Sequence, residues 1–169
     1  MIRAAAEEDL QAILDIYNEA IIHSTAVYDY KPHTLQDRKQ WFADKQAAGD
    51  PVLVYESERM VVGFAAFGQF RAWPAYKYCV EHSIYVGEAG KRKGVGSALL
   101  QELIGIATER EYATMVAGID ETNLGSIRLH EKFGFRHAGT IEKAGYKFGR
   151  WLNLAFYQLM LPGPSEPKE

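Results

Sequence analysis

The chain has 169 residues, a formal net charge of −3 and one cysteine. A chain of this length is most simply one domain that buries roughly 70% of the surface exposed by its unfolded form. The small negative charge gives no general attraction to nucleic acid or to an anionic membrane, and a lone cysteine excludes an intramolecular disulfide.

The first third of the chain is predicted to contain a short strand and two helices. Residues 1–5 form the strand, and acidic residues at 7–9 suit the positive end of a helix dipole. After a loop at 23–32, Thr34 is a good N-cap for a second helix, which Gly49-Asp50-Pro51 ends. The apolar face of the first helix is predicted from residues that recur at helical spacing: Leu10, Ile13, Leu14, Tyr17 and Ile21.

A change of pattern after residue 51 indicates strands. Residues 52–55 and 61–67 are rich in β-branched and aromatic side chains, and a polar turn separates them, so they predict a hairpin. Residues 68–77 hold several aromatic side chains in a segment that suits neither a strand nor a flexible linker, which indicates a packed functional loop.

The rest of the chain alternates between strands and helices. The predicted strands are 80–86, 114–118, 136–146 and 151–161, and the predicted helices are 97–110 and 123–133, with Gly134 ending the latter. The N-terminus has no signal-type apolar run and no membrane-spanning stretch, so the cytoplasm is the expected compartment. No cluster of Cys and His residues has ligand spacing, so no metal is expected.

A basic glycine turn is the most informative motif. Lys91-Arg92-Lys93-Gly94-Val95-Gly96 follows a strand and precedes a helix predicted to begin at Ser97. Glycines let the backbone approach a ligand, and the first N–H groups of a helix have no partner inside it, so this turn predicts a phosphate cradle. It does not match the dinucleotide fingerprint, because it lies in the middle of the chain and Leu99 stands where the third glycine would be.

This turn resembles motif A of the GNAT superfamily of acyl-CoA N-acyltransferases, whose core is [Q/R]-x-x-G-x-[G/A]. Lys91 replaces the usual Gln or Arg. A second match, Asn123 to Phe135, looks like the later helix of that superfamily and its Gly-Phe turn. Within the superfamily, the strings 80–86 and 144–151 are similar to the phosphinothricin and methionine sulfone/sulfoximine N-acetyltransferases.

The resemblance implies a fold, a cosubstrate and partners. It implies an α/β (α+β) GNAT fold: a single domain over residues 1–161, with helices on both faces of a mixed, mostly antiparallel sheet that splays at the cofactor site. Residues 162–169 are expected to be a frayed tail. The cosubstrate is acetyl-CoA, and the acceptor is a small amino acid-like molecule, with no nucleic acid or membrane partner. A homodimer is expected by analogy and because closing strands rich in Trp151, Phe156 and Tyr157 leave apolar surface to cover.

The resemblance also assigns cofactor contacts. The pyrophosphate lies on backbone N–H groups of the glycine turn, pantetheine pairs with the central strand, and the N–H near Val86 supplies part of an oxyanion site. Asn123 either holds the pantetheine arm or serves only as a helix N-cap. The implied cofactor-binding residues are Ile84, Tyr85, Val86, Lys91, Arg92, Lys93, Gly94, Val95, Gly96, Ser97, Asn123 and Ser126.

Two residues are candidate catalysts. Glu81 resembles the carboxylate used by the closest families, and partial burial would raise its pKa so that it accepts a proton from the acceptor ammonium group. The alternative is an exposed strand residue paired with a cation, and strand alternation turns His82 to the opposite face. His130 stands where most GNAT enzymes have Tyr, and acid, base and structural roles remain open for it.

The acceptor site is expected to involve Arg71 and Trp73, a guanidinium for a carboxylate and an indole for an apolar side chain. Further candidate donors are Tyr28, Tyr76, Tyr78, Lys143 and Lys147, although aromatic side chains at this density also suit a core or a subunit interface. The predicted activity is transfer of an acetyl group to an α-amine by direct attack. The alternatives are a protein N-terminal or ribosomal-protein acetyltransferase and a non-catalytic acyl-CoA sensor.

Overall fold

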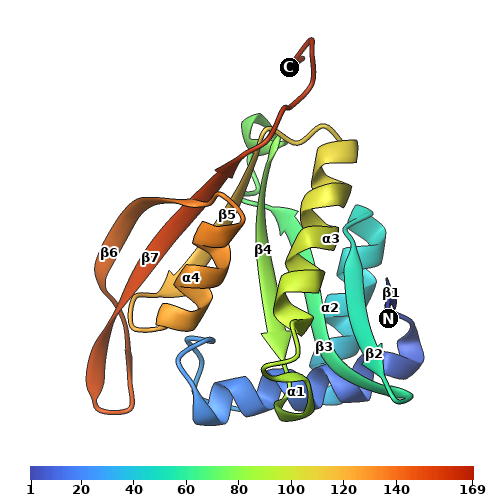
Figure 1. Ribbon diagram of the computed structural model, residues 1–169, viewed down its shortest axis with the longest axis vertical. Coiled ribbons are helices and arrows are strands. Elements are labelled where there is room, and N and C mark those ends of the chain that lie inside the picture. The colour runs from blue at the N-terminus through green and yellow to red at the C-terminus, as the bar shows by residue number, and fades with distance from the viewer. The chain divides into compact units, whose positions relative to one another are not determined.

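Strands and helices follow one another in the predicted order in the computed structural model, which describes residues 1–169 (Figure 1). The strands are β1 (Ile2–Ala4), β2 (Val52–Ser57), β3 (Met60–Gln69), β4 (Cys79–Val86), β5 (Thr114–Asp120), β6 (Arg136–Lys147) and β7 (Arg150–Met160). The helices are α1 (Leu10–His23), α2 (Leu35–Ala48), α3 (Val95–Glu109) and α4 (Leu124–Lys132), with short 3-10 turns at Glu7–Asp9, Pro74–Tyr76 and Glu88–Gly90.

The strands hydrogen-bond in the order β1-β2-β3-β4-β5-β7-β6. β4 and β5 are parallel, whereas β1 with β2, β2 with β3, β5 with β7, and β6 with β7 are antiparallel. This arrangement confirms the predicted mixed, mostly antiparallel sheet. Most boundaries differ from the predicted ones by one or two residues: α3, for example, begins at Val95, two residues before the predicted start at Ser97, and β5 ends at Asp120, two residues after the predicted end.

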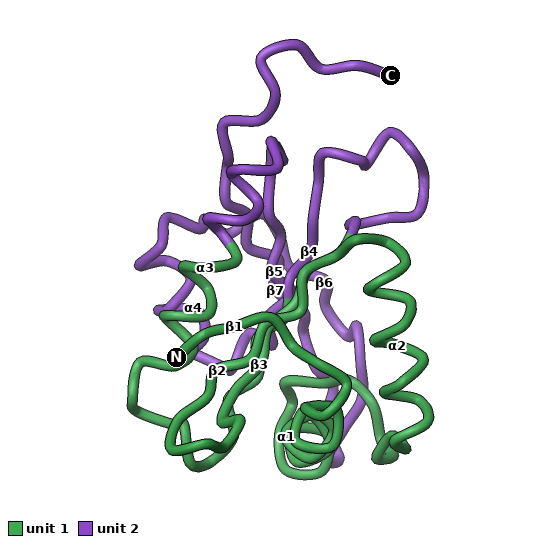
Figure 2. The backbone as a smooth tube through the Cα atoms, turned by 90° about the vertical axis from the view of Figure 1, so that its right-hand side faces the viewer, with its two compact units in different colours: residues 1–68, 83–103 green, residues 69–82, 104–169 purple.

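Contacts divide the chain into two compact units (Figure 2). Unit 1 comprises Met1–Gly68 and Ser83–Leu103, and unit 2 comprises Gln69–His82 and Ile104–Glu169. The boundary passes through β4 and α3, so each of these elements contributes residues to both units.

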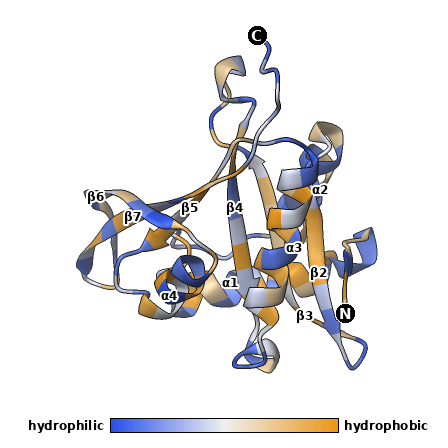
Figure 3. Ribbon diagram, turned by 45° about the horizontal axis from the view of Figure 1, so that its top comes forward, coloured by the Kyte–Doolittle hydropathy of each residue, from blue (hydrophilic) through white to orange (hydrophobic).

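In unit 1, α1 and α2 cover one face of the strands and α3 begins on the other. Alternation along β3 explains this, because Phe64 joins the core beneath α1 and α2 while Gly63 faces Val95 and Leu99 of α3. The apolar residues of β2 stand out in Figure 3. The core beneath α1 and α2 consists of Leu10, Ile13, Phe42, Val52, Val54, Phe64 and Ala66.

Local sequence fixes the ends of α2. The Thr34 side chain accepts the Asp37 N–H, and the Asp37 carboxylate accepts the Thr34 N–H, which is a capping box. At the other end, Gly49 has φ 73°, a left-handed conformation that glycine adopts at little cost. The predicted cap and stop are both confirmed.

In unit 2, β7 lies between β5 and β6, and α4 packs through aromatic rings. The rings of His130 and Phe135 lie 5.0 Å apart, and Gly134, with φ 93°, ends the helix as predicted. β6 pairs with β7 through two register shifts, between His137 and Gly139 and between Ile141 and Gly145. The C-terminal residues contribute no further helix or strand, but the backbone of Lys168 forms two hydrogen bonds with the Tyr78 hydroxyl.

None of the helices combines the length and apolar character needed to cross a membrane. No group of three or more His, Cys, Asp or Glu side chains is arranged to hold a metal ion.

Candidate active site

The glycine turn in unit 1 presents main-chain N–H groups at the start of α3. Arg92 and Gly94 both have positive φ, 61° and 75°, which turns the chain sharply before the helix. The first helical bond runs from the Ala98 N–H to the Gly94 carbonyl at 3.0 Å, so the three preceding amides have no helical acceptor. Residues 91–94 are exposed. The turn therefore has the donors and the positive helix end that a phosphate group requires.

Small residues let this turn lie directly on the strands. A Cβ at Gly63 would come within 2.8 Å of Val95 Cγ1 and 3.2 Å of the Tyr85 carbonyl. A Cβ at Gly90 would lie 2.8 Å from the Val62 carbonyl. The start of α3 is thus held against β3 and β4 at a separation that only glycine permits.

The basic side chains of the turn are not equivalent. The Lys91 ammonium pairs with Glu88 three residues earlier, which raises the pKa of Lys91. Arg92 and Lys93 form no ion pair and extend into solvent. The donors best placed for a phosphate are therefore backbone amides and these two side chains, since Lys91 is already partnered.

Glu81 in unit 2 is half-buried over β5. Its Oε2 lies 3.5 Å from where a Cβ on Gly118 would be, so the missing side chain there leaves room for the carboxylate. Burial raises the pKa of Glu81, and the positive charge of Arg71 offsets part of that rise. A carboxylate with a raised pKa and partial access to solvent can accept a proton near neutral pH.

His82 and His130 form a buried pair in the same unit. Their Nε2 atoms are 3.0 Å apart, and the side chains are only 7% and 4% exposed. Burial lowers the pKa of His82 to about 3 and also lowers the pKa of His130, so both rings are neutral at neutral pH. His82 points away from Glu81, as strand alternation predicted.

The two rings make three contacts in which a ring N–H would be the donor: one with each of two backbone carbonyls and one between the rings. His82 Nδ1 faces the Val116 carbonyl at 3.2 Å, and His130 Nδ1 faces the Ser126 carbonyl at 2.7 Å, and a carbonyl oxygen only accepts. The contact between the two Nε2 atoms needs a third N–H. Two neutral imidazoles supply only two, and the Ser126 hydroxyl, 3.4 Å from His130 Nδ1, can donate to that nitrogen when its proton lies on Nε2 instead.

The loop after β3 contributes Arg71 beside Glu81. The Arg71 guanidinium lies 4.0 Å from the centroid of the Phe70 ring and donates to the Phe70 carbonyl at 2.7 Å. Phe70 packs edge-on against Tyr76 and Phe156. The predicted packing of this loop therefore holds for Phe70, whereas Trp73 is 73% exposed and Tyr76 is 40% exposed.

The other predicted acceptor residues belong to different elements. Tyr78 is engaged by the backbone of Lys168, and Lys143 lies in an irregular part of β6 with its Nζ 5.7 Å from the Trp151 ring centroid. Lys147 is 5% exposed, and its Nζ lies 5.1 Å from the Phe148 ring centroid. Tyr28, in the loop after α1, is 37% exposed. Asn123 caps α4, because its Oδ1 accepts the Ser126 N–H at 3.2 Å.

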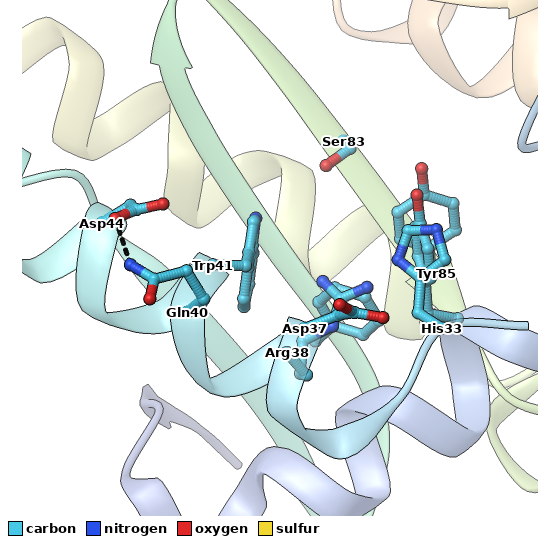
Figure 4. A pocket seen from close by; sticks show the side chains of 10 residues that line it. His33, Asp37, Arg38, Gln40, Trp41, Asp44, Ser83 and Tyr85 are labelled. Atoms are coloured by element: carbon cyan, nitrogen blue, oxygen red, sulfur yellow. Dashed lines mark hydrogen bonds between the residues drawn. The ribbon is translucent and has the colours of Figure 1, made fainter.

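A pocket in unit 1 was not predicted from the sequence. Its volume is about 580 Å³, and it opens between α2 and β4 (Figure 4). It is lined by Tyr17, His33, Asp37, Arg38, Gln40, Trp41, Asp44, Phe64, Ser83 and Tyr85. The sequence feature that could have indicated this pocket is Arg38. It lies three residues after Leu35 and three before Trp41, which places a cation on the apolar stripe of the helix.

The sequence matches the family model described as "Acetyltransferase (GNAT) domain" over residues 2–155. It is 42% identical over 166 residues to an L-methionine sulfoximine/L-methionine sulfone acetyltransferase of Salmonella typhimurium, covering 98% of this chain and 97% of the relative. The chain belongs to the GNAT acetyltransferase family, which confirms the resemblance found in the sequence.

Two solved structures show the same fold. One is a GNAT superfamily phosphinothricin acetyltransferase from Sinorhizobium meliloti in complex with acetyl-CoA, with TM-score 0.95 and 35% identity, covering 100% of this chain and 93% of that one. The other is a ribosomal-protein-alanine N-acetyltransferase from Brucella melitensis, with TM-score 0.93 and 42% identity, covering 95% and 99%.

Proposed function

We propose that this protein transfers the acetyl group of acetyl-CoA to the α-amine of a small amino acid-like acceptor of the methionine sulfone, methionine sulfoximine or phosphinothricin type. The observation that carries the proposal is the half-buried Glu81 carboxylate with a raised pKa beside the Arg71 guanidinium. An α-amino acid presents one carboxylate and one ammonium group, and the two side chains offer the complementary charges.

Direct attack requires a defined movement of bonds and protons. The acceptor ammonium group loses a proton to Glu81, directly or through one water, and the free amine attacks the thioester carbonyl. The new C–N bond forms as the C–S bond breaks, the nitrogen gives up its second proton to become the amide, and the leaving thiolate takes up one proton, so that one proton in total remains on Glu81 for release. The amides at Val95, Gly96 and Ser97, which have no acceptor inside the helix, together with the exposed side chains of Arg92 and Lys93, would hold the pyrophosphate of the donor.

The proposed roles along β4 are those of a pantetheine-binding strand. Ile84, Tyr85 and Val86 would pair with the pantetheine arm, and the N–H near Val86 would face the thioester oxygen. Asn123 and Ser126 at the start of α4 remain candidate contacts to that arm. We propose that the neutral His130 ring accepts the second proton of the nitrogen and passes it to the leaving thiolate.

The test is thiol release from acetyl-CoA with methionine sulfone, methionine sulfoximine and phosphinothricin, measured against a panel of peptides. Saturable release with the amino acids supports the proposal. Release with peptides alone would favour a protein acetyltransferase, the alternative favoured by the name of the Brucella melitensis homologue. Coenzyme A binding without release from any amine would identify a sensor.

A cytoplasmic location and a homodimer are also part of the proposal. Trp151 is 57% exposed and offers apolar surface for a second copy, whereas Tyr157 is 7% exposed and packs against His137, so it offers little. Sedimentation of the wild type and of Trp151→Ser tests the dimer. If the wild type sediments as a monomer at all concentrations, the proposed homodimer is rejected.

A further inference from the structure

Arg38 is a buried cation that forms no ion pair, although the charge of Asp37 acts on it. The residue is 4% exposed, no carboxylate forms an ion pair with it, and its Nε has no hydrogen-bond partner. Arginine stays protonated in proteins, so the charge persists although burial lowers its pKa. A buried charge and an unpaired buried donor are both costly, which indicates a site that is completed by something outside the chain.

Aromatic rings fix the guanidinium in place. Its central carbon lies 4.2 Å from the centroid of the Tyr17 ring and 4.5 Å from that of Trp41, which is a cation–π arrangement on both rings. Tyr85 packs edge-on against Tyr17 with ring centroids 5.3 Å apart. The planar fork is thus held rigidly, and rigid placement of donors lowers the entropic cost of binding a ligand.

The nearby carboxylates have other partners. Asp37 accepts the Thr34 N–H at 2.8 Å as part of the helix cap, and Asp44 accepts from the Gln40 amide at 2.9 Å. In Figure 4 the α2 side chains lie on one side of the pocket, with Ser83 and Tyr85 of β4 on the other. The pocket therefore combines aromatic walls, one buried cation and the hydroxyl of Ser83, within the size range of small-molecule sites.

We infer that this pocket binds a small molecule through a strongly accepting oxygen group on sulfur, phosphorus or carbon, held by Arg38. The aromatic walls suit a short aliphatic stem, and the guanidinium suits sulfonyl, phosphinate or carboxylate oxygens. The inference deepens the proposed function and rests on it for the identity of the ligand: the pocket would take the oxygen-bearing end of the acceptor and so reject amino acids without one.

Methionine sulfone and methionine form a matched pair of probes, because they differ only in the two sulfonyl oxygens. In the NMR spectrum of the full-length protein, the Arg38 Nε–H resonance, assigned by its loss in Arg38→Lys, is expected to shift with the sulfone and to stay in place with methionine. Equal shifts with both ligands, or none with either, would overturn the inference.

Calorimetry on Arg38→Met provides the second measurement. Loss of a charge-assisted hydrogen bond should weaken methionine sulfone binding about ten- to a hundredfold while coenzyme A binding is retained. Lys39→Met removes an exposed charge from the same helix and should behave as the wild type. Replacing a buried, unpaired charge by an apolar side chain of similar volume should leave the melting temperature unchanged or raised. Arg38→Met that melts much lower and still prefers the sulfone would identify Arg38 as purely structural.

Failure of the inference and failure of the proposed function give different results. Wild-type turnover of methionine sulfone together with unchanged sulfone affinity in Arg38→Met overturns the inference and leaves the function standing. A sulfone-specific shift of Arg38 without thiol release from any amine supports the pocket and rejects the acetyltransferase proposal.

Discussion

The Nε2 atoms of His82 and His130 lie 3.0 Å apart in the interior of unit 2, with each Nδ1 directed at a backbone carbonyl. This relationship ties the candidate catalytic histidine on α4 to the strand residue next to Glu81. It also makes the stability of the protein depend on pH, because the folded state disfavours protonation of His82.

Stability is expected to fall on acidification through the histidine range. His82 has an ordinary pKa of 6.5 and a folded-state pKa of about 3. The unfolded chain therefore binds a proton at this residue more readily than the folded protein does. The contribution of His82 to the free energy of unfolding is full above pH 6.5 and is lost as the pH falls toward 3. Chemical denaturation across this range measures the slope. His82→Phe should flatten it and cost about 1–3 kcal/mol by leaving the Val116 carbonyl and His130 unpaired. The exposed His23→Gln serves as a control and should keep the wild-type slope.

Glu81→Gln should lower kcat by about a hundredfold or more, the usual contribution of a general base, with little change in coenzyme A affinity. The wild-type rate should rise with pH through a pKa above the ordinary glutamate value of 4.5, and the variant should lose this dependence. Thiol release as a function of pH provides the measurement. A raised pKa in a carboxyl group destabilises the fold at high pH, so the variant should also be at least as stable as the wild type above that pKa. A variant with full turnover at every pH would exclude Glu81 as the base.

Two glycine substitutions distinguish crowding from helix propensity. Gly63→Ala would place a methyl group 2.8 Å from Val95 Cγ1 and force the start of α3 outward, at a cost of about 1–3 kcal/mol. Coenzyme A affinity should fall with it, because the displaced turn carries the phosphate donors. Gly105→Ala, in the same helix with no atom within 4 Å of the new Cβ, should stabilise by about 0.5–1 kcal/mol. Thermal unfolding measures the stability of both variants, and calorimetry measures their affinity for coenzyme A. Unchanged coenzyme A affinity in Gly63→Ala would contradict the assignment of the phosphate cradle.

Asp9→Asn should destabilise unit 1. The Asp9 carboxylate accepts from two nitrogens of Arg3, at 2.7 and 2.9 Å, and from the Ala6 N–H at 2.8 Å. These bonds lower its pKa, so the stability they give is present above the ordinary value of 3.8 and is lost as pH falls below it. A loss of about 1.5–3 kcal/mol at neutral pH is expected. Asp15→Asn, on the exposed side of α1, should change stability little.

The sequence predicted the order of elements because each has its own local signal. Thr34 and Gly49 mark the ends of α2, and Gly134 marks the end of α4. The start of α3 lies before the predicted one because the glycine spacing assigns Gly96 to the turn, whereas the helix includes it. Glycine tolerates both the turn and the helix conformation, so the local pattern alone does not fix this boundary.

The candidate site was predicted only where residues lie close in sequence. The turn at 91–97 and the opposite orientations of Glu81 and His82 follow from spacing alone. The contact of His82 with His130 joins residues 48 positions apart, and the Arg38 pocket joins α1, α2, β3 and β4. Such meetings depend on how helices pack on strands, which a single sequence does not specify. Tyr78 and Lys143 have contacts that the sequence did not predict, with the backbone of Lys168 and with the Trp151 ring.

The irregular pairing of β6 affects how copies of the chain can meet. This strand ends the order of the sheet, its two register shifts interrupt the ladder, and Lys143 lies within one of them. Extending the sheet with a strand of a neighbouring chain requires a continuous row of backbone hydrogen bonds along β6. The register shifts misalign its amides, and Lys143 adds a charged side chain. This edge is thus protected against fibrillar assembly, and an association between copies through β6 would have to rely on side chains.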